Sequence, residues 1–276
     1  MTYRTILVHA DLAPAAQHRV ELACTVALDM GAHLIGVATT GISRFLQPGA
    51  AGMSGGAIAE QLEALRDDAR RALDGFDAVA RRAGVPSVER QLCSDDTAGG
   101  LALQARYCDL AVLSQTDPDA PAAAATSLPA YVMLHAARPV LVVPYLGRFH
   151  DFGRHALVAW DGGIEATRAV AAALPLLRRA ALVTVAVFNA SHGADHGDQP
   201  GADLALYLSR HGIAVTVAPL SIGRDIGEEL LSTAADVGAG LLVMGGYGHA
   251  RLRELLLGGV TETVLRRMTL PVLMMH

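Results

Sequence analysis

An internal repeat constrains the fold of this chain more than any other feature of its sequence. The segment Thr5-Ile-Leu-Val-His-Ala-Asp11 recurs 150 residues later as His155-Ala-Leu-Val-Ala-Trp-Asp161. Each copy is a short apolar run that ends in aspartate, as expected of a buried strand followed by a turn. Two more apolar phrases recur in the same order, at offsets of 131 and 132: Asp109–Ser114 with Gly240–Gly245, and Arg138–Val143 with Leu270–Met275. The repeat therefore predicts two similar domains.

The predicted domains span residues 1–147 and 153–276, with a turn-rich boundary between them. The later repeats have a smaller offset because the first copy carries an insertion of about 20 residues, a length that surface loops tolerate. This insertion includes Gly49–Gly56, which we expect to be mobile and without catalytic function. The clearest helix of the first copy places Leu62, Leu65, Ala69, Leu73, Phe76 and Val79 on one stripe.

Strand and helix patterns alternate along both copies. This alternation predicts an α/β fold of two tandem doubly wound five-stranded parallel sheets, flanked by helices in a Rossmann-like arrangement. Because the last apolar run of each copy would otherwise be an exposed edge, we expect those two strands to pair antiparallel or pack face to face, within the chain or across a homodimer. In the second copy, strands are expected near residues 155–160, 181–187, 213–219, 240–244 and 271–275, and helices near 163–179, 201–211, 224–238 and 259–268.

Composition excludes several classes of function. All 22 basic residues are arginine, so there is no Walker-type lysine, Schiff-base lysine or Ser-Lys dyad. A net charge of -5 argues against nucleic-acid binding, and the longest uncharged stretch, 120–137, contains prolines that argue against a membrane span. Three distant cysteines encode neither a disulfide framework nor a zinc site, and the N-terminus does not resemble a signal peptide. A cytoplasmic protein is expected.

The strongest candidate site follows the fourth strand of the second copy. Gly245 and Gly248 let the backbone turn tightly and expose N–H groups. Gly258 and Gly259 precede a helix expected to begin near Val260, whose N-terminus suits phosphate oxygens. Taken alone, these glycines could equally be turn and cap residues. Positive charge nearby can come from His249, Arg251 and Arg253.

The whole pattern is more specific than the glycines alone. The pattern consists of Gly-x-x-Gly, nine residues, a glycine and a small residue, a helix and a final Pro-Val-Leu strand. It resembles the universal stress protein family, and the resemblance extends across both copies. The resemblance implies a nucleotide, ATP or AMP, between the ends of the first and fourth strands, with Mg²⁺ as an optional companion. It implies that Asp161 lies at the ribose and adenine side and that the backbone of Val187 borders the adenine. The other nucleotide-binding residues that it implies are Met244, Gly245, Gly248, His249, Gly258, Gly259, Val260 and Thr261.

One residue of the second copy departs from the family pattern. Gly259 stands where ATP-binding relatives usually have serine or threonine, and the lost hydroxyl contact would cost on the order of 1 kcal/mol. Thr261 is two residues away and could replace part of that contact. AMP, ADP and ATP cannot be ranked from the sequence.

The first copy keeps the strand-end Asp11 but little else of the motif. Ser114–Asp117 occupies the Gly-x-x-Gly place, and Thr126-Ser127 occupies the Gly-Gly place. Asp117 and Asp119 would repel a polyphosphate. A nucleotide is therefore expected in the second copy only.

Three weaker clusters carry no predicted catalytic or metal role. Ser54 lies in a Gly-x-Ser-x-Gly match that lacks the preceding strand of a nucleophile elbow. His9 and Asp11 share a strand face, but no third partner can be named, which favours a buried or ligand-lining histidine. The best interpretation of one further cluster is a hydrated loop: His192, Asp195, His196 and Asp198.

The sequence as a whole predicts a stress-response protein that binds an adenine nucleotide in its C-terminal half as a regulatory ligand. Neither a general base nor a lysine is available near the phosphates, so ATP hydrolysis would be weak at most. The alternative is a protein of the same fold that dimerises or docks a partner without nucleotide. A third hypothesis, an adenine-nucleotide hydrolase, lacks a visible reaction-specific motif. No nucleic-acid or membrane partner is expected.

Overall fold

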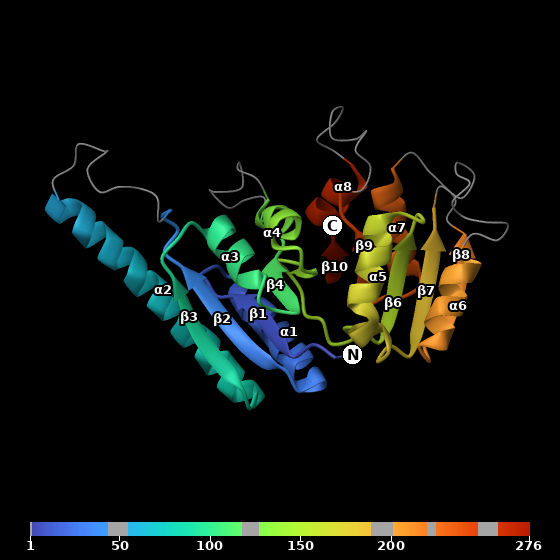
Figure 1. Cartoon of the computed structure of the whole chain (residues 1–276), viewed down its shortest axis with the longest axis horizontal. Helices are drawn as coiled ribbons and strands as arrows, with labels where there is room; N and C mark the ends of the chain where they lie inside the picture. Colours follow the sequence, from blue (N-terminus) through green and yellow to red (C-terminus); the bar gives the residue numbers. More distant parts are fainter. Residues whose placement is uncertain (1, 44–54, 118–126, 189–200, 220–224, 248–258) are drawn as a thin grey trace. The chain divides into compact units, whose positions relative to one another are not determined.

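The structure is a computed structural model that describes residues 2–43, 55–117, 127–188, 201–219, 225–247 and 259–276 (Figure 1). The chain forms two compact units. The first is built on Thr2–Ser114 and includes the helix at 128–136, and the second is built on Pro139–His276 and includes Gln115.

The first unit contains a parallel sheet of four strands in the order β3-β2-β1-β4. Its strands are β1 (Thr5–His9), β2 (His33–Thr39), β3 (Val88–Cys93) and β4 (Leu110–Ser114). Its helices are α1 (Ala16–Met30), α2 (Gly55–Ala83), α3 (Thr97–Ala105) and α4 (Leu128–Ala136).

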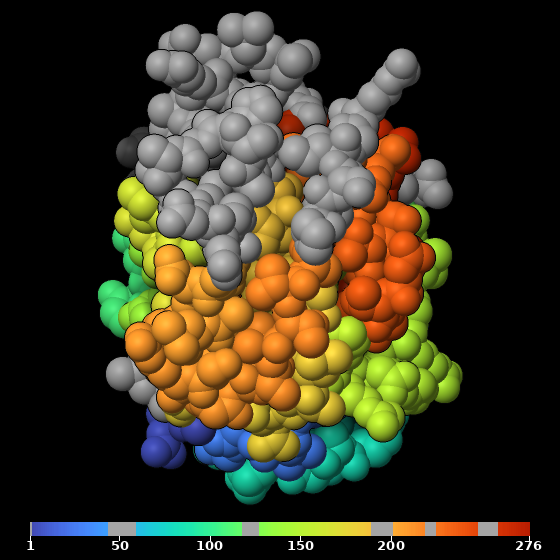
Figure 2. Space-filling model, turned by 90° about the vertical axis from the view of Figure 1, so that its right-hand side faces the viewer, coloured from blue at the N-terminus to red at the C-terminus, as the bar shows by residue number. Residues whose placement is uncertain are grey.

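The second unit contains six strands in the order β5-β10-β9-β6-β7-β8. Its strands are β5 (Val140–Val143), β6 (His155–Trp160), β7 (Leu182–Val187), β8 (Val215–Pro219), β9 (Leu241–Gly245) and β10 (Val272–Met275). Its helices are α5 (Ile164–Leu177), α6 (Ala202–Arg210), α7 (Ile226–Asp236) and α8 (Val260–Arg267). Helices α6 and α7 form the surface of this unit that faces the reader in Figure 2.

The last strands of the two copies pair antiparallel within one chain, which is one of the arrangements predicted from the sequence. Val272 of β10 is the partner of Val142 of β5, and Leu273 is the partner of Leu141. The β5 residues are 0–1% exposed, so this pairing removes two apolar edges from solvent. Because β5 joins the second unit, the compact units contain four and six strands instead of five each.

The predicted α/β architecture and the tandem arrangement are confirmed. Strands β1, β4, β6 and β9 are almost continuously buried, as expected for parallel strands covered by helices on both faces. The last predicted helix, 259–268, corresponds to α8, and the predicted strand 240–244 corresponds to β9. No helix within the described residues is both long and apolar enough to cross a bilayer.

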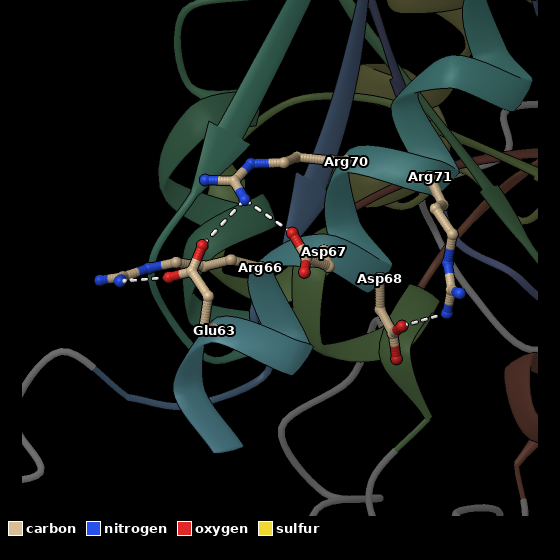
Figure 3. A network of polar contacts seen from close by, with 6 residues as sticks. All are labelled: Glu63, Arg66, Asp67, Asp68, Arg70 and Arg71. Atoms are coloured by element: carbon tan, nitrogen blue, oxygen red, sulfur yellow. Dashed lines mark hydrogen bonds and ion pairs between the residues drawn. The ribbon is translucent and has the colours of Figure 1, made fainter. Parts of the chain in front are cut away.

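Helix α2 confirms the amphipathic stripe predicted for the first copy. Leu73 and Phe76 are buried, whereas Leu62 and Leu65 are half-buried. The solvent face carries a network of ion pairs (Figure 3), in which Arg70 Nη1 lies 2.9 Å from Glu63 Oε1 and 2.7 Å from Asp67 Oδ1. Exposed pairs of this kind are screened by solvent and contribute little to stability, so burial of the apolar face dominates the stability of α2. Residues 49–54 of the insertion lie outside the described residues.

Candidate functional site

Asp161 lies at the carboxyl end of a central strand of the second unit. It follows β6, which pairs with β7 and β9. Ligands of doubly wound sheets bind at this edge, beyond the carboxyl ends of the strands. The Gly163 N–H, just before α5, donates a 2.8 Å hydrogen bond to Asp161 Oδ1. In the part of the chain that the structure describes, no arginine or histidine forms an ion pair with Asp161.

The equivalent carboxylate of the first unit has an internal cationic partner. Arg19 of α1 is 1% exposed, and its Nη2 donates a 3.0 Å hydrogen bond to Asp11 Oδ1. Its Nη1 donates to Ser114 Oγ at 2.7 Å, and its Nε donates to the carbonyl oxygen of His9 at 2.8 Å. Because His9 and Ser114 end β1 and β4, one guanidinium fills the place where those two strands end.

His9 completes this buried network. Its Nδ1 lies 3.2 Å from Asp11 Oδ2. Burial lowers the pKa of His9 to about 4, and the charge of Arg19 acts in the same direction. Burial would raise the pKa of Asp11, yet Arg19 and His9 hold it below its usual value. Arg19 is thus the third partner of His9 and Asp11 that the sequence analysis did not name.

The spacing of buried residues along α1 could have identified Arg19 as a buried arginine from the sequence. It lies on one stripe of α1 with Ala23, Val26 and Met30, all of which are buried. An arginine on such a stripe must be paired inside the protein. The equivalent position in the second copy, eight residues after Asp161, is the buried Ala169. The two copies therefore differ in charge at the same structural position.

Gly245 allows the end of β9 to approach the first turn of α5. A Cβ on this residue would lie 2.6 Å from the Ala166 nitrogen and 2.7 Å from the carbonyl carbon of Glu165. Both are backbone atoms, which cannot move aside as the end of a flexible side chain can. Packing against α5 therefore requires glycine here, independently of any ligand. This contact also places Gly245 beside the helix whose N-terminal Gly163 is bonded to Asp161.

We expect Gly245→Ala to lower the free energy of unfolding by about 2 kcal/mol, because overpacking against backbone forces a local shift. Gly259→Ala is the matched control, since a Cβ at Gly259 would meet no atom within 4 Å. Urea denaturation of both variants measures the difference. Equal midpoints would contradict the packing requirement.

Thr261 connects α8 to the turn after β9. Its side chain is 7% exposed, and its Oγ1 accepts a 3.1 Å hydrogen bond from the Tyr247 N–H. Tyr247 has a left-handed backbone with φ of 55°, and the preceding Gly246 N–H donates to the Met275 carbonyl at 2.9 Å. The Thr261 hydroxyl therefore already accepts one hydrogen bond in the fold, and its own hydrogen can donate to an anionic ligand.

Helix α8 begins at Val260, with Gly259 as its N-cap residue. Gly259 has φ of -76° and ψ of 176°, and no side chain caps the helix. The first N–H groups of a helix have no intrahelical partner, so they are available to an anion. Glu262 adds a negative charge to this turn. Burial raises the pKa of Tyr247, and the charge of Glu262 acts in the same direction.

Val187 and Met244 lie at the carboxyl ends of β7 and β9, and their side chains are 3% and 4% exposed. Val187 pairs with Trp160 of β6 and with Pro219 of β8. Because both side chains belong to the core, these residues can meet a ligand only through their backbone.

The structure places some of the predicted residues together and does not describe others. Gly245 contacts α5, and Tyr247 is bonded to Thr261 of α8, so the described residues connect β6, β9, α5 and α8. The described residues contain no group of three or more His, Cys, Asp or Glu side chains that could hold a metal ion. The following lie outside the described residues: Gly248, His249, Arg251, Arg253, Gly258, Ser54, His192, Asp195, His196 and Asp198.

Comparison with known proteins identifies the family. The model of the universal stress protein family matches residues 2–144 and 153–276. A universal stress protein from Archaeoglobus fulgidus DSM 4304 has a similar fold, with a TM-score of 0.70 and 15% identity over 98% of this chain and 95% of that chain. A universal stress protein of Methanocaldococcus jannaschii is 44% identical over 46 residues, which are 17% of this chain and 28% of that protein. A universal stress protein solved in complex with cAMP aligns at 20% identity with 52% of this chain and 98% of its own, with a TM-score of 0.41. Because the family model matches both copies of the repeat, the chain belongs to the universal stress protein family.

Proposed function

We propose that this chain is a stress-response protein whose C-terminal half binds an adenine nucleotide, ATP or AMP, as a regulatory ligand. One observation carries the proposal: Asp161 has no ion-pair partner among the described residues, whereas its counterpart Asp11 is bonded to the buried Arg19. A free carboxylate at the carboxyl end of a central strand can accept hydrogen bonds from ligand hydroxyls. In the first copy, the Arg19 side chain occupies the corresponding position beside Asp11.

The residues of the second unit fit a nucleotide at this edge. Asp161 would accept from the ribose, and the backbone at Val187 would border the adenine. The open space at Gly259 and the N-terminus of α8 would receive the phosphates, with a bound Mg²⁺ where a polyphosphate needs charge neutralisation. Gly248, His249 and Gly258, predicted from the sequence, would complete the phosphate site together with Gly245, Val260 and Thr261.

The proposal includes a cytoplasmic location and, at most, slow hydrolysis. Cys24, Cys93 and Cys108 are not joined in disulfides, as expected in a reducing compartment. Burial raises the pKa of Cys24 to about 12 and that of Cys108 to about 11, so both stay protonated. The chain contains no lysine to neutralise a transferring phosphoryl group, which argues for a ligand that is held and sensed.

Calorimetric titration of ATP and AMP tests the proposal. Gly248→Asp should abolish binding, because it adds bulk and negative charge to the predicted phosphate loop. Asp117→Gly is the matched control: it changes the corresponding loop of the first copy and should leave the affinity unchanged. Equal affinity in wild type and Gly248→Asp would show that these glycines are structural.

Gly259→Ser should tighten nucleotide binding by about 1 kcal/mol, or about fivefold, because it restores a hydroxyl that can donate to phosphate. The extended backbone at Gly259 is the conformation of an N-cap serine, and a Cβ meets no neighbouring atom there. The same titration measures the effect. The control is Ser127→Gly, at the N-cap of α4 in the first copy, which should leave the affinity as it is. Unchanged or weaker binding by Gly259→Ser would contradict the placement of the phosphates.

One observation favours the alternative of a docking protein that binds no nucleotide. Glu262 places a negative charge in the first turn of α8, next to the predicted phosphates. If neither wild type nor Gly259→Ser takes up ATP or AMP at millimolar concentration, the docking function replaces the nucleotide-binding one.

A further inference from the structure

The carboxyl end of α8 is capped by a residue from the first copy of the repeat. The Nε2 of Gln115 donates to the carbonyl oxygens of Leu265 at 3.0 Å and of Arg266 at 3.1 Å. These carbonyls belong to the last turn of α8, where the helix supplies no partners of its own. Gln115 is 4% exposed, and its bond to the Leu265 carbonyl is buried, whereas its bond to the Arg266 carbonyl is part-buried.

The backbone and the side chain of Gln115 are both held in place. Its N–H donates to the carbonyl oxygen of Val143, the last residue of β5, at 2.7 Å. Its Oε1 accepts a 3.3 Å hydrogen bond from the Tyr145 N–H. The hydrogen bond to Oε1 thus fixes the orientation of the carboxamide, so that its Nε2 faces α8.

The corresponding helix of the first copy is capped differently. The carbonyl of His135, in the last turn of α4, accepts hydrogen bonds from Arg106 Nε at 3.3 Å and Nη2 at 3.1 Å. Arg106 is the C-cap residue of α3, and the C-cap residue of α7 at the equivalent place is Val237, which has no side-chain donor. The position equivalent to Gln115 is Gly246, which has no side chain. The second copy therefore has no counterpart of the Arg106 side-chain cap, and Gln115 bonds to the last carbonyls of α8 instead.

We propose that Gln115 is a positioning residue for the nucleotide site, because it holds α8 at the end opposite to the phosphates. This inference rests on the proposed function. Helix α8 has only eight residues, so displacement at its carboxyl end moves its N-terminus as well. The N-terminal end is held by the bond between Thr261 and the Tyr247 N–H, and Thr263 and Arg267 bond to Asp225 and Glu228 at the start of α7. Gln115 adds a fixed point at the last carbonyls of the helix. The first copy, which has lost its own phosphate loop, thereby contributes a residue to the site of the second.

The test combines Gln115→Met with the rescue variant Gln115→Met/Val237→Arg. Methionine keeps the volume and removes both donors, and arginine at Val237 supplies to α8 the kind of cap that Arg106 gives to α4. Hydrogen exchange of the α8 amides in ligand-free protein reports the cap, and calorimetric titration of AMP reports the site. We expect Gln115→Met to speed α8 exchange at least tenfold and to weaken AMP binding at least fivefold. The rescue variant should recover most of both effects, while exchange in α1 stays constant throughout.

Three results would overturn the inference, and they are distinguishable. Unchanged AMP affinity in Gln115→Met, beside clear binding by wild type, would refute the positioning role and leave the proposed function standing. A wild-type protein that binds no AMP would refute the proposed function, and the positioning role with it. Unchanged α8 exchange in Gln115→Met would show that Gln115 does not hold the helix.

Discussion

Replacing Arg19 with methionine is expected to lower the free energy of unfolding by about 3 kcal/mol, because removal of one partner of a buried ion pair leaves the other partner unpaired. The substitution removes hydrogen bonds to Asp11, Ser114 and the His9 carbonyl at once. The Asp11 side chain is 30% exposed, so solvent screens part of the remaining charge and the effect should lie at the low end of the usual range. Urea denaturation at pH 7 measures it.

The control for this prediction is Arg168→Met on α5, an exposed arginine next to Ala169, the counterpart of Arg19. It should change the stability by less than about 0.5 kcal/mol. Combining Arg19→Met with Asp11→Leu should recover part of the lost stability, because no unpaired carboxylate then remains. Equal losses in Arg19→Met and Arg168→Met would contradict a buried network.

The stability of the first unit should fall as the pH drops from about 6.5 to about 4. His9 is neutral in the fold, because burial lowers its pKa to about 4, whereas the unfolded chain protonates near 6.5. Within that window the unfolded state binds one more proton than the native state, so stability rises with pH. A shift of this size is worth about 3 kcal/mol. The lowered pKa of Asp11 acts in a separate window, at more acidic pH, where protonation of its native carboxylate removes further stability.

Denaturation at pH 7 and pH 5, with the unfolding of the first unit followed by hydrogen exchange in β1, measures this dependence. His9→Gln is the control, because it removes the titrating group and should flatten the profile between these pH values. A wild-type profile as flat as that of His9→Gln would show that His9 is not held neutral.

The sequence predicted the architecture well because the repeat and the apolar runs are local signals. Contact between the last strands could be predicted because two uncharged Pro-Val-Leu runs had to be covered, and the structure selects antiparallel pairing within the chain from the alternatives. The role of Gly245 was predicted only in part: its spacing suggested a phosphate turn, whereas the structure shows that packing against α5 already requires a glycine. The nucleotide-binding roles of Gly248, His249 and Gly258 stay predictions, because these residues lie outside the described part of the chain.

The two residues that the sequence analysis missed illustrate what local patterns cannot predict. Arg19 was overlooked because arginine usually lies at the surface, and only its place on an apolar stripe indicates a buried partner. Gln115 bonds to Leu265, 150 positions away, and no periodicity connects them. Both residues follow from comparing the two copies after folding: Arg19 bonds to Asp11 in the first copy, and Gln115 bonds to the end of α8 in the second.

The stoichiometry of nucleotide binding tests the central claim most directly. Calorimetric titration of AMP into wild-type protein should give one binding event per chain, since Arg19 is bonded to Asp11 in the first copy, whereas Asp161 has no ion-pair partner among the described residues. Asp161→Ala should abolish that single event. Two events per chain, or one event that survives Asp161→Ala, would contradict the assignment of the nucleotide to the C-terminal half.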